Sequence, residues 1–511
     1  MSSIFDQILT AAESGATAGA AEHAAPVGFD GTRTEPSARF VLPVAPATKV
    51  LYGYQAAAVE TILQHRRVLL GLQPGLGKTV ILQSVAAAQA AEGGRTLVVV
   101  PPSLRTSPWA QDFAADFPHL RVAVVEGQKA APFPDADVVV LGDSVLQHRA
   151  EDVRAWSPSA ILVDEAHRFK SREAKRTKAL TALADGLAAD AIVVCATGTV
   201  VANHAVDVYS PLRATGRTNA TAVSGGQSWS AFLSSWCETE QVWTGRGYVT
   251  VPVGVRDAEA LRQRLVSTCY VSVPRSDVLD LPERTTAVRS LSLNGDAAQY
   301  RRVEREFLAW IRETRGDDAF RRAQKAEAIV RLNTLWQEDG LAKVNAAAEY
   351  VESLVEQGEP VVVFAHHTAV IAGLYARLLK DGLRVGTIVG GQSADDKAAI
   401  VAAFQGGDLD VVLGQHTAAG TGLTLTASAH VVFAQLPWSP GVFGQAQDRI
   451  YRIGQERHVT THVLNGLGLV SERLWEVLQA KVVVADTINV GGEDTVAWGS
   501  VEEAVLESFG W

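Results

Sequence analysis

A glycine-rich turn that ends in Lys78 and Thr79 is the first segment of the chain with a pattern suited to chemistry. Residues 70–79 read LGLQPGLGKT, and a helical pattern begins around Val80. Consecutive backbone N–H groups in such a turn, with the N-terminus of the following helix, can cradle a polyphosphate. The lysine can then reach the β and γ phosphates, and the threonine hydroxyl can ligate Mg²⁺. We predict a phosphate loop whose nucleotide-binding residues are Pro74, Gly75, Leu76, Gly77, Lys78 and Thr79.

Two adjacent carboxylates follow another apolar run later in the chain. Asp164 and Glu165 come directly after the residues AILV at 160–163. The carboxyl ends of parallel strands are where α/β sheets bind ligands, so this position suits a catalytic pair. Asp164 can hold Mg²⁺ through water, and Glu165 can polarise the water that attacks a γ-phosphate. The two segments together predict ATP and Mg²⁺ as cofactors.

A pair of arginines near the end of the chain could complete such a site. Residues 445–455 read QAQDRIYRIGQ, and helical spacing would place Arg449 and Arg452 on one face. Guanidinium groups stay protonated and offer forked donors to a developing phosphoryl charge. If a second lobe closes over nucleotide bound to the first, both residues act as arginine fingers supplied within the chain. The alternative is structural pairing with Asp448 and Glu456.

Short apolar runs that alternate with helical patterns must position these residues. The first series is VLLGL, TLVVV, VAVVE, VVVLG, AILVD and AIVVCAT, and the second is VVVFAHH, VGTIV, VVLGQ, HVVFAQ and THVLN. Such alternation predicts an α/β fold with two parallel-sheet lobes. The interval 228–339 is mostly helical in pattern. Its arginine-rich part fits a solvated helix face and a DNA-tracking face equally well.

These patterns divide the chain into five expected parts. They are a flexible N-terminal tail at 1–47, an ATP-binding lobe at 48–214, a helical insertion and connector at 215–345, a second lobe at 346–488 and an acidic tail at 489–511. The N-terminal part is rich in Ala, Gly, Ser and Pro without steady apolar periodicity. From Asp486 onward the chain has acidic residues but no Lys or Arg, so we expect a peripheral appendage there.

The composition bounds the class of protein. The 511 residues are 47% apolar and 20% charged, which is ample for two or three domain cores. No apolar run approaches the roughly 20 residues that span a bilayer, and no Lys or Arg precedes Arg33 as a secretory signal requires. We therefore expect an intracellular, cytoplasmic protein without membrane contact. The formal charge of -10 argues against electrostatic coating of nucleic acid, although a local basic surface is compatible with it.

The strings around these sites resemble, in the correct order, the motifs of the Swi/Snf branch of superfamily 2 helicases. The matching strings are LYGYQ at 51–55, VVVPPSLRTSPWAQDF at 98–113, DEAHRFKSREAKRTKAL at 164–180, TGT at 197–199, PRSDVLDLPER at 274–284, FAHH at 364–367, AAGTGLTLTASAHVVF at 418–433 and WSPGVFGQAQDRIYRIGQ at 438–455. FAHH and the last string are similar to the annealing-helicase (HARP) subgroup. The resemblance spans about residues 50–490 and implies two RecA-like lobes.

The resemblance also implies roles for single residues. Gln55 would read the adenine, and Gly422 would join the ATP-binding set. Thr197, Gly198, Thr199 and Gln445 would couple hydrolysis to DNA contact. Phosphate contacts to DNA would come from Ser103, Lys170, Arg172, Lys175, Arg275 and His366, so binding should be largely independent of sequence.

The chain departs from the family pattern at a few positions. Leu72, Gln73 and Pro74 stand where the family has Asp-Glu-Met, and Val200 replaces a proline after the TGT string. Neither change removes a catalytic group. The N-terminal region is shorter than the substrate-recognition modules of cellular annealing helicases, which puts fork-specific annealing in doubt.

We therefore predict an ATP-dependent translocase on double-stranded or branched DNA that remodels DNA structures or DNA–protein complexes. The alternatives are a helicase that separates, branch-migrates or anneals strands, and a scaffold that binds DNA without hydrolysis. Intact Lys78, Glu165 and both arginines argue against the scaffold. His366 and His367 have no evident third metal ligand, and Trp236, Trp243, Trp310 and Trp336 are read as packing residues rather than base-stacking platforms.

Overall fold

The chain divides into two compact units. Unit 1 comprises Met1–Glu238, Val255–Asp280 and Asp486–Thr495, and unit 2 comprises Thr239–Gly254, Leu281–Ala485 and Val496–Trp511. The computed structural model describes residues 42–73, 75–127, 132–198, 205–216, 228–243, 247–273, 281–293, 297–314, 318–416, 423–490 and 501–511. The predicted site residues Pro74, Thr199, Arg275 and Gly422 lie outside these ranges. Across the described part of the chain, no helix is long and apolar enough to cross a membrane.

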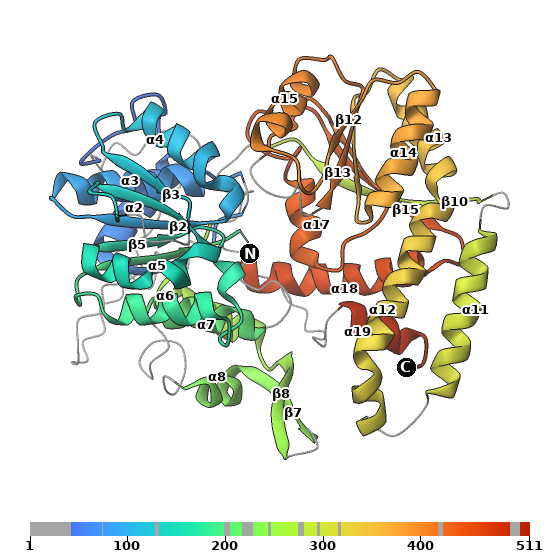
Figure 1. Cartoon of the computed structure of the whole chain (residues 1–511), viewed down its shortest axis with the longest axis horizontal. Helices are drawn as coiled ribbons and strands as arrows, with labels where there is room; N and C mark the ends of the chain where they lie inside the picture. The colour runs from blue at the N-terminus through green and yellow to red at the C-terminus, as the bar shows by residue number, and fades with distance from the viewer. Residues whose placement is uncertain are drawn as a thin grey trace, which may run out of the picture. The chain divides into compact units, whose positions relative to one another are not determined.

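Unit 1 is built on a parallel sheet (Figure 1). Its strand order is β3-β4-β2-β5-β6-β1-β9. Its strands are β1 (Arg67–Leu70), β2 (Thr96–Val100), β3 (Val122–Val125), β4 (Val138–Gly142), β5 (Ala160–Val163), β6 (Ile192–Ala196) and β9 (Tyr270–Val271). The central strands are buried, which is why they read as continuous apolar runs in the sequence. The six strands predicted for the first series are confirmed.

Helices follow most of these strands. They are α2 (Gly53–His65), α3 (Lys78–Ala91), α4 (Gln111–Asp116), α5 (Asp143–Trp156), α6 (Lys175–Asp185), α7 (Tyr209–Ala214), α8 (Trp229–Trp236) and α9 (Ala258–Val266). Ile62 of α2 and Ile81 of α3 are fully buried in the core beneath the sheet. Leu42 and Val44, which lie in the predicted flexible tail at 1–47, pack against the same core.

Unit 2 contains a second parallel sheet with the order β10-β15-β14-β11-β13-β12. Its strands are β10 (Arg284–Leu291), β11 (Val361–Ala365), β12 (Val385–Ile388), β13 (Val411–Gln415), β14 (His430–Phe433) and β15 (Val459–Gly466). Along β11, Val362 and Phe364 enter one hydrophobic cluster while Val361 and Val363 enter another, as the two-residue period of a strand requires. The second series of predicted strands is also confirmed, and the chain is α/β with two parallel sheets.

The helices of unit 2 cover both faces of its sheet. They are α11 (Ala298–Glu313), α12 (Asp318–Ala342), α13 (Val344–Val355), α14 (Thr368–Lys380), α15 (Ala394–Gln405), α17 (Pro440–Gln447), α18 (Val470–Val490) and α19 (Val501–Ser508). Figure 1 shows α11 and α12 as an extended helical pair. Phe307 and Ile311 of α11 and Leu335 of α12 belong to the same buried cluster as strand residues such as Phe364 and Phe433, so the pair packs onto the core of unit 2.

The interval 228–339 carries strands as well as the predicted helices. β7 (Cys237–Trp243) and β8 (Tyr248–Val255) form a two-stranded sheet. β9 extends the sheet of unit 1 beside β1, and β10 extends the sheet of unit 2 beside β15. Most of β10 is exposed, so backbone pairing rather than apolar burial defines this edge strand. Its polar sequence gave no strand signal for that reason.

The interpretation of the acidic C-terminal segment as a peripheral appendage is wrong for residues 501–511. Val501, Val505 and Leu506 are buried in the core of unit 2. The Trp511 ring stacks on Trp310 at 4.9 Å, and Phe509 lies edge-on to Phe307 at 5.3 Å. The charge count concealed an amphipathic helix because its apolar residues are interleaved with glutamates.

Candidate active site

The phosphate loop joins β1 to α3 in unit 1. Gly75 and Gly77 have φ values of 87° and 76°, a left-handed conformation that side-chain-bearing residues rarely adopt. Lys78 is the first residue of α3 and Thr79 the second. The Lys78 ammonium is buried and donates to the Leu72 carbonyl at 3.0 Å. The loop therefore holds a cation at a helix N-terminus, where backbone N–H groups also lack helical acceptors.

Two residues of α2 form hydrogen bonds to the phosphate loop. The Tyr54 hydroxyl and the Gln55 amide both donate to the Leu76 carbonyl, at 3.1 and 3.2 Å. A Cβ atom at Gly77 would meet Gln55 Nε2 at 2.3 Å, so a side chain there would displace Gln55 as well as strain the backbone at φ 76°. The structure brings Gln55 to the phosphate loop, whereas its adenine-reading role stays a prediction. Sequence reasoning missed Tyr54.

Asp164 and Glu165 leave the end of β5, as predicted. Asp164 Oδ2 accepts the indole N–H of Trp109 at 3.1 Å, and Oδ1 accepts the Glu165 backbone N–H at 2.9 Å. Burial, followed by the charge of the neighbouring Glu165, raises the pKa of Asp164 to about 6, and the positive charge of Lys78 opposes this shift. A buried carboxylate near a lysine and a threonine-bearing helix N-terminus provides the oxygen donors that Mg²⁺ prefers.

Glu165 is connected to the TGT string through His167. Glu165 has φ 50° and ψ 49°, one of three described non-glycine residues in the left-handed region. Its carboxylate lies 3.2 Å from His167 Nδ1, and the same nitrogen lies 3.2 Å from the Thr197 hydroxyl. Thr197 is buried at the end of β6, and its N–H donates to the Leu70 carbonyl of β1 at 3.0 Å. Strained backbone of this kind concentrates at functional sites.

The predicted arginines lie in unit 2 and are brought together there. Arg449 and Arg452 both donate to the Leu423 carbonyl, at 3.4 and 3.2 Å, and Arg449 Nε also donates to the Gln445 carbonyl at 3.1 Å. The prediction that a helix carries them is wrong, because α17 ends at Gln447. The chain tightens there into i→i−3 turns, and the Leu425 N–H donates to the Arg449 carbonyl at 2.9 Å.

His366 lies at the end of β11 in a polar network of unit 2. Gln435 Oε1 accepts the backbone N–H groups of His366 and His367 at 3.2 and 3.0 Å. The His366 ring lies 4.4 Å from the Trp336 ring. Burial, followed by the nearby His367, lowers the pKa of His366 to about 4, so its ring is neutral near pH 7. Any contact of this ring with a phosphate would be a hydrogen bond rather than an ion pair.

The remaining predicted DNA contacts lie between β5 and the start of α6. Lys170 faces Asp207 at 3.8 Å, and the Arg172 guanidinium lies 4.8 Å over the Trp229 ring. Lys175 is exposed at the first residue of α6. For Ser103 the structure describes only the backbone. The structure therefore places three basic residues in one segment, and their contact with DNA stays a prediction.

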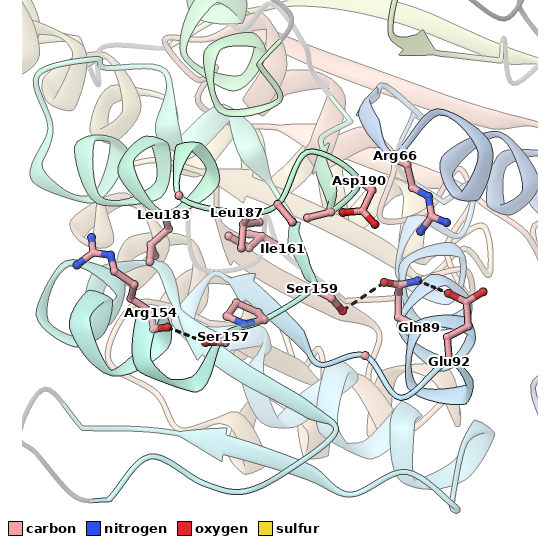
Figure 2. Close-up of a pocket in the computed structure, with 15 residues that line it drawn as sticks. Arg66, Gln89, Glu92, Arg154, Ser157, Ser159, Ile161, Leu183, Leu187 and Asp190 are labelled. Carbon is pink, nitrogen blue, oxygen red and sulfur yellow. Dashed lines mark hydrogen bonds between the residues drawn. The ribbon is translucent and has the colours of Figure 1, made fainter.

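A cavity of about 480 Å³ lies elsewhere in unit 1 (Figure 2). Its lining comes from the C-terminal ends of α3, α5 and α6 and the residues that lead into β5 and β6, including Gln89, Arg154, Ser159 and Leu187. Figure 2 shows Ser159 bound to Gln89, which in turn binds Glu92. This is the amino edge of the strands, opposite the phosphate loop, so the cavity is separate from the candidate active site.

Two parallel α/β sheets, one carrying a phosphate loop followed by a carboxylate pair, define a nucleotide-binding protein of the two-lobed helicase type. The SNF2-related domain matches residues 54–341. The helicase conserved C-terminal domain matches residues 342–454. The first match covers more than half of the chain, and the chain belongs to the SNF2-related family.

Several known proteins are similar to the chain. It is 27% identical over 484 residues to the DNA annealing helicase and endonuclease ZRANB3 of Mus musculus, covering 91% of this chain and 44% of that protein. It is 28% identical over 425 residues to the SWI/SNF-related matrix-associated actin-dependent regulator of chromatin subfamily A-like protein 1 of Xenopus tropicalis, covering 82% and 42%. The chain thus spans less than half the length of these relatives. A solved Sulfolobus solfataricus SWI2/SNF2 ATPase core in complex with dsDNA matches at 22% identity and a TM-score of 0.41, covering 88% of this chain and 96% of that one.

Proposed function

We propose that the chain is a DNA-dependent ATPase that translocates along double-stranded DNA and remodels DNA structures or DNA–protein complexes. The observation that carries the proposal is the grouping of buried Lys78 and Asp164 with partly buried Glu165 in unit 1. Membership of the SNF2-related family supports DNA as the partner. In this account residues 48–214 form the ATP-binding lobe and residues 346–488 the second lobe.

The residues divide the work of hydrolysis among them. The loop N–H groups and Lys78 bind the β and γ phosphates, and Gln55 selects the adenine. Thr79 and Asp164 hold Mg²⁺, which neutralises phosphate charge when bound. Glu165 orients the attacking water, and Arg449 and Arg452 stabilise the charge that develops on the transferred phosphoryl group.

DNA binding is assigned to phosphate contacts. Lys170, Arg172 and Lys175 share one segment that follows the carboxylate pair in the sequence. DNA bound to this segment would therefore contact residues that are directly connected to the catalytic carboxylates. The link from Glu165 through His167 to Thr197 gives a physical route by which DNA contact alters the position of Glu165. Binding should weaken steeply with salt and vary little with base sequence.

A second candidate function is strand annealing or branch migration. It is favoured by the similarity to a relative whose name describes a DNA annealing helicase. The two functions share the ATP chemistry and differ in what happens to the strands. Annealing would re-form duplex from open strands, whereas translocation leaves the duplex paired.

One set of assays on a single preparation tests these proposals. ATP hydrolysis is measured with duplex, single-stranded and forked DNA, and the same protein is assayed for triplex displacement, strand separation and annealing, with Lys78→Ala as the inactive control. Stimulation by duplex and triplex displacement without strand separation support translocation. Annealing of open strands supports the second candidate. A wild-type chain that hydrolyses no ATP with any DNA contradicts both.

A further inference from the structure

A tryptophan outside the predicted catalytic set fixes the Asp164 carboxylate. The Trp109 indole N–H donates to Oδ2 at 3.1 Å, and the Glu165 backbone N–H donates to Oδ1 at 2.9 Å. One donor therefore holds each oxygen, which restrains rotation of the carboxylate. Each oxygen keeps a further lone pair for another partner. Trp109 is fully buried, so water does not compete for this hydrogen bond.

The segment that carries Trp109 has an unusual backbone. Arg105–Ala110 winds as a π-helical turn and leads directly into α4. Pro108 lies inside this turn and has no N–H to donate to an α-helical hydrogen bond. Turns of this type are rare and occur frequently at functional sites. Here the wider winding includes Trp109, the residue that contacts Asp164.

Trp109 also touches the helix that follows the phosphate loop. Its backbone carbonyl accepts the side-chain amide of Gln83 at 3.4 Å, and Gln83 is buried in α3. Its ring packs at 5.9 Å from Phe113 of α4. One side chain thus contacts the carboxylate segment while its own backbone contacts α3. A displacement of the π-helical turn would therefore change the contacts of both Asp164 and α3.

We propose that Trp109 is a positioning residue that orients Asp164 for Mg²⁺ and ties the π-helical segment to the metal side of the nucleotide site. The inference rests on the proposed function and deepens it. Outer partners that orient a metal-binding group typically affect metal affinity by about 10- to 100-fold when removed. Trp109→Phe deletes the N–H donor and keeps most of the ring.

The test titrates Mg²⁺ into the full chain with a fluorescent ADP analogue and records nucleotide affinity at each concentration. Trp109→Phe is expected to raise the Mg²⁺ concentration at the midpoint about 10-fold or more, while affinity measured in EDTA stays within about twofold because the phosphate loop is untouched. Trp156→Phe is the matched control, since its indole nitrogen is buried without a hydrogen-bond partner in the described structure. It should leave both values unchanged.

The outcomes separate this inference from the proposed function. If the wild-type chain binds no nucleotide, the proposed function fails. If the wild-type chain responds to Mg²⁺ and folded Trp109→Phe shows the same midpoint, only the role of Trp109 is overturned. If Trp109→Phe folds poorly, a measurement on the wild-type chain tests the same proposal. With ¹⁵N-labelled indoles in the ADP-bound wild type, an N–H signal should shift when Mg²⁺ is added, and no shift among the 11 tryptophans overturns the proposal.

Discussion

His167 Nδ1 lies 3.2 Å from the hydroxyl of Thr197, which joins the carboxylate segment after β5 to the end of β6. The same ring nitrogen is 3.2 Å from the Glu165 carboxylate. A protonated Nδ1 can donate its hydrogen to only one of these oxygens at a time, whereas an unprotonated Nδ1 can accept the hydroxyl hydrogen of Thr197. A shift of Thr197 would change how His167 meets Glu165.

We predict that Thr197→Val reduces stimulation of ATP hydrolysis by DNA and leaves hydrolysis without DNA nearly unchanged. The substitution removes the hydroxyl and keeps the branched shape, so the expected loss is about tenfold, the value of one hydrogen bond. Thr61→Val is the control, because its hydroxyl bonds a helix carbonyl away from the site. Equal stimulation in wild type and Thr197→Val would remove Thr197 from the coupling route.

Glu165→Gln should bind ATP normally and hydrolyse it slowly, since the amide keeps the size of the side chain but cannot accept a proton from water. We expect turnover to fall by about 10² to 10⁴, measured as phosphate release with duplex DNA present. Glu173→Gln changes an exposed glutamate nearby and should have no effect. Normal turnover in Glu165→Gln would show that another group orients the water.

Acid should destabilise unit 2 through its buried histidines. Burial, followed by the charges of His430 and Arg289, lowers the pKa of His462 to about 4. The unfolded chain then binds more protons between about pH 6.5 and 4, so the free energy of unfolding falls as the pH falls through that window, by about 3 kcal/mol for His462. Urea unfolding at several pH values should show a smaller pH dependence in His462→Gln. Substitution of the exposed His148 should leave the pH dependence of the free energy of unfolding unchanged.

The docking of α19 can be tested by truncating one buried side chain. Leu506 is 1% exposed, and Leu506→Ala should lower the free energy of unfolding of unit 2 by about 2 to 5 kcal/mol. The exposed neighbour substitution Glu507→Ala should change it by less than about 0.5 kcal/mol. Similar values for the two variants would mean that α19 is not part of the core of unit 2 in solution.

The sequence predicted the sheets well and the finer contacts poorly. Parallel strands buried on both faces produce apolar runs such as TLVVV, and phosphate loops and carboxylate pairs have strong local patterns. The partnership of Trp109 with Asp164 has no such pattern, because it depends on how the π-helical turn packs against β5. β10 lacks apolar character because it pairs through its backbone at an edge. The buried face of α19 was hidden among acidic residues.

The central proposal is that Arg449 and Arg452, which are distant in sequence from Lys78, take part in ATP hydrolysis. The most direct measurement is the rate of ATP hydrolysis by Arg452→Lys at saturating duplex DNA, compared with wild type, together with nucleotide affinity in the absence of DNA. Lysine keeps the charge and loses the planar fork that bridges phosphate oxygens. We predict that turnover falls by about 10³ to 10⁵, as for other arginine fingers, while nucleotide affinity changes little. Near-normal DNA-stimulated hydrolysis in Arg452→Lys would contradict the account.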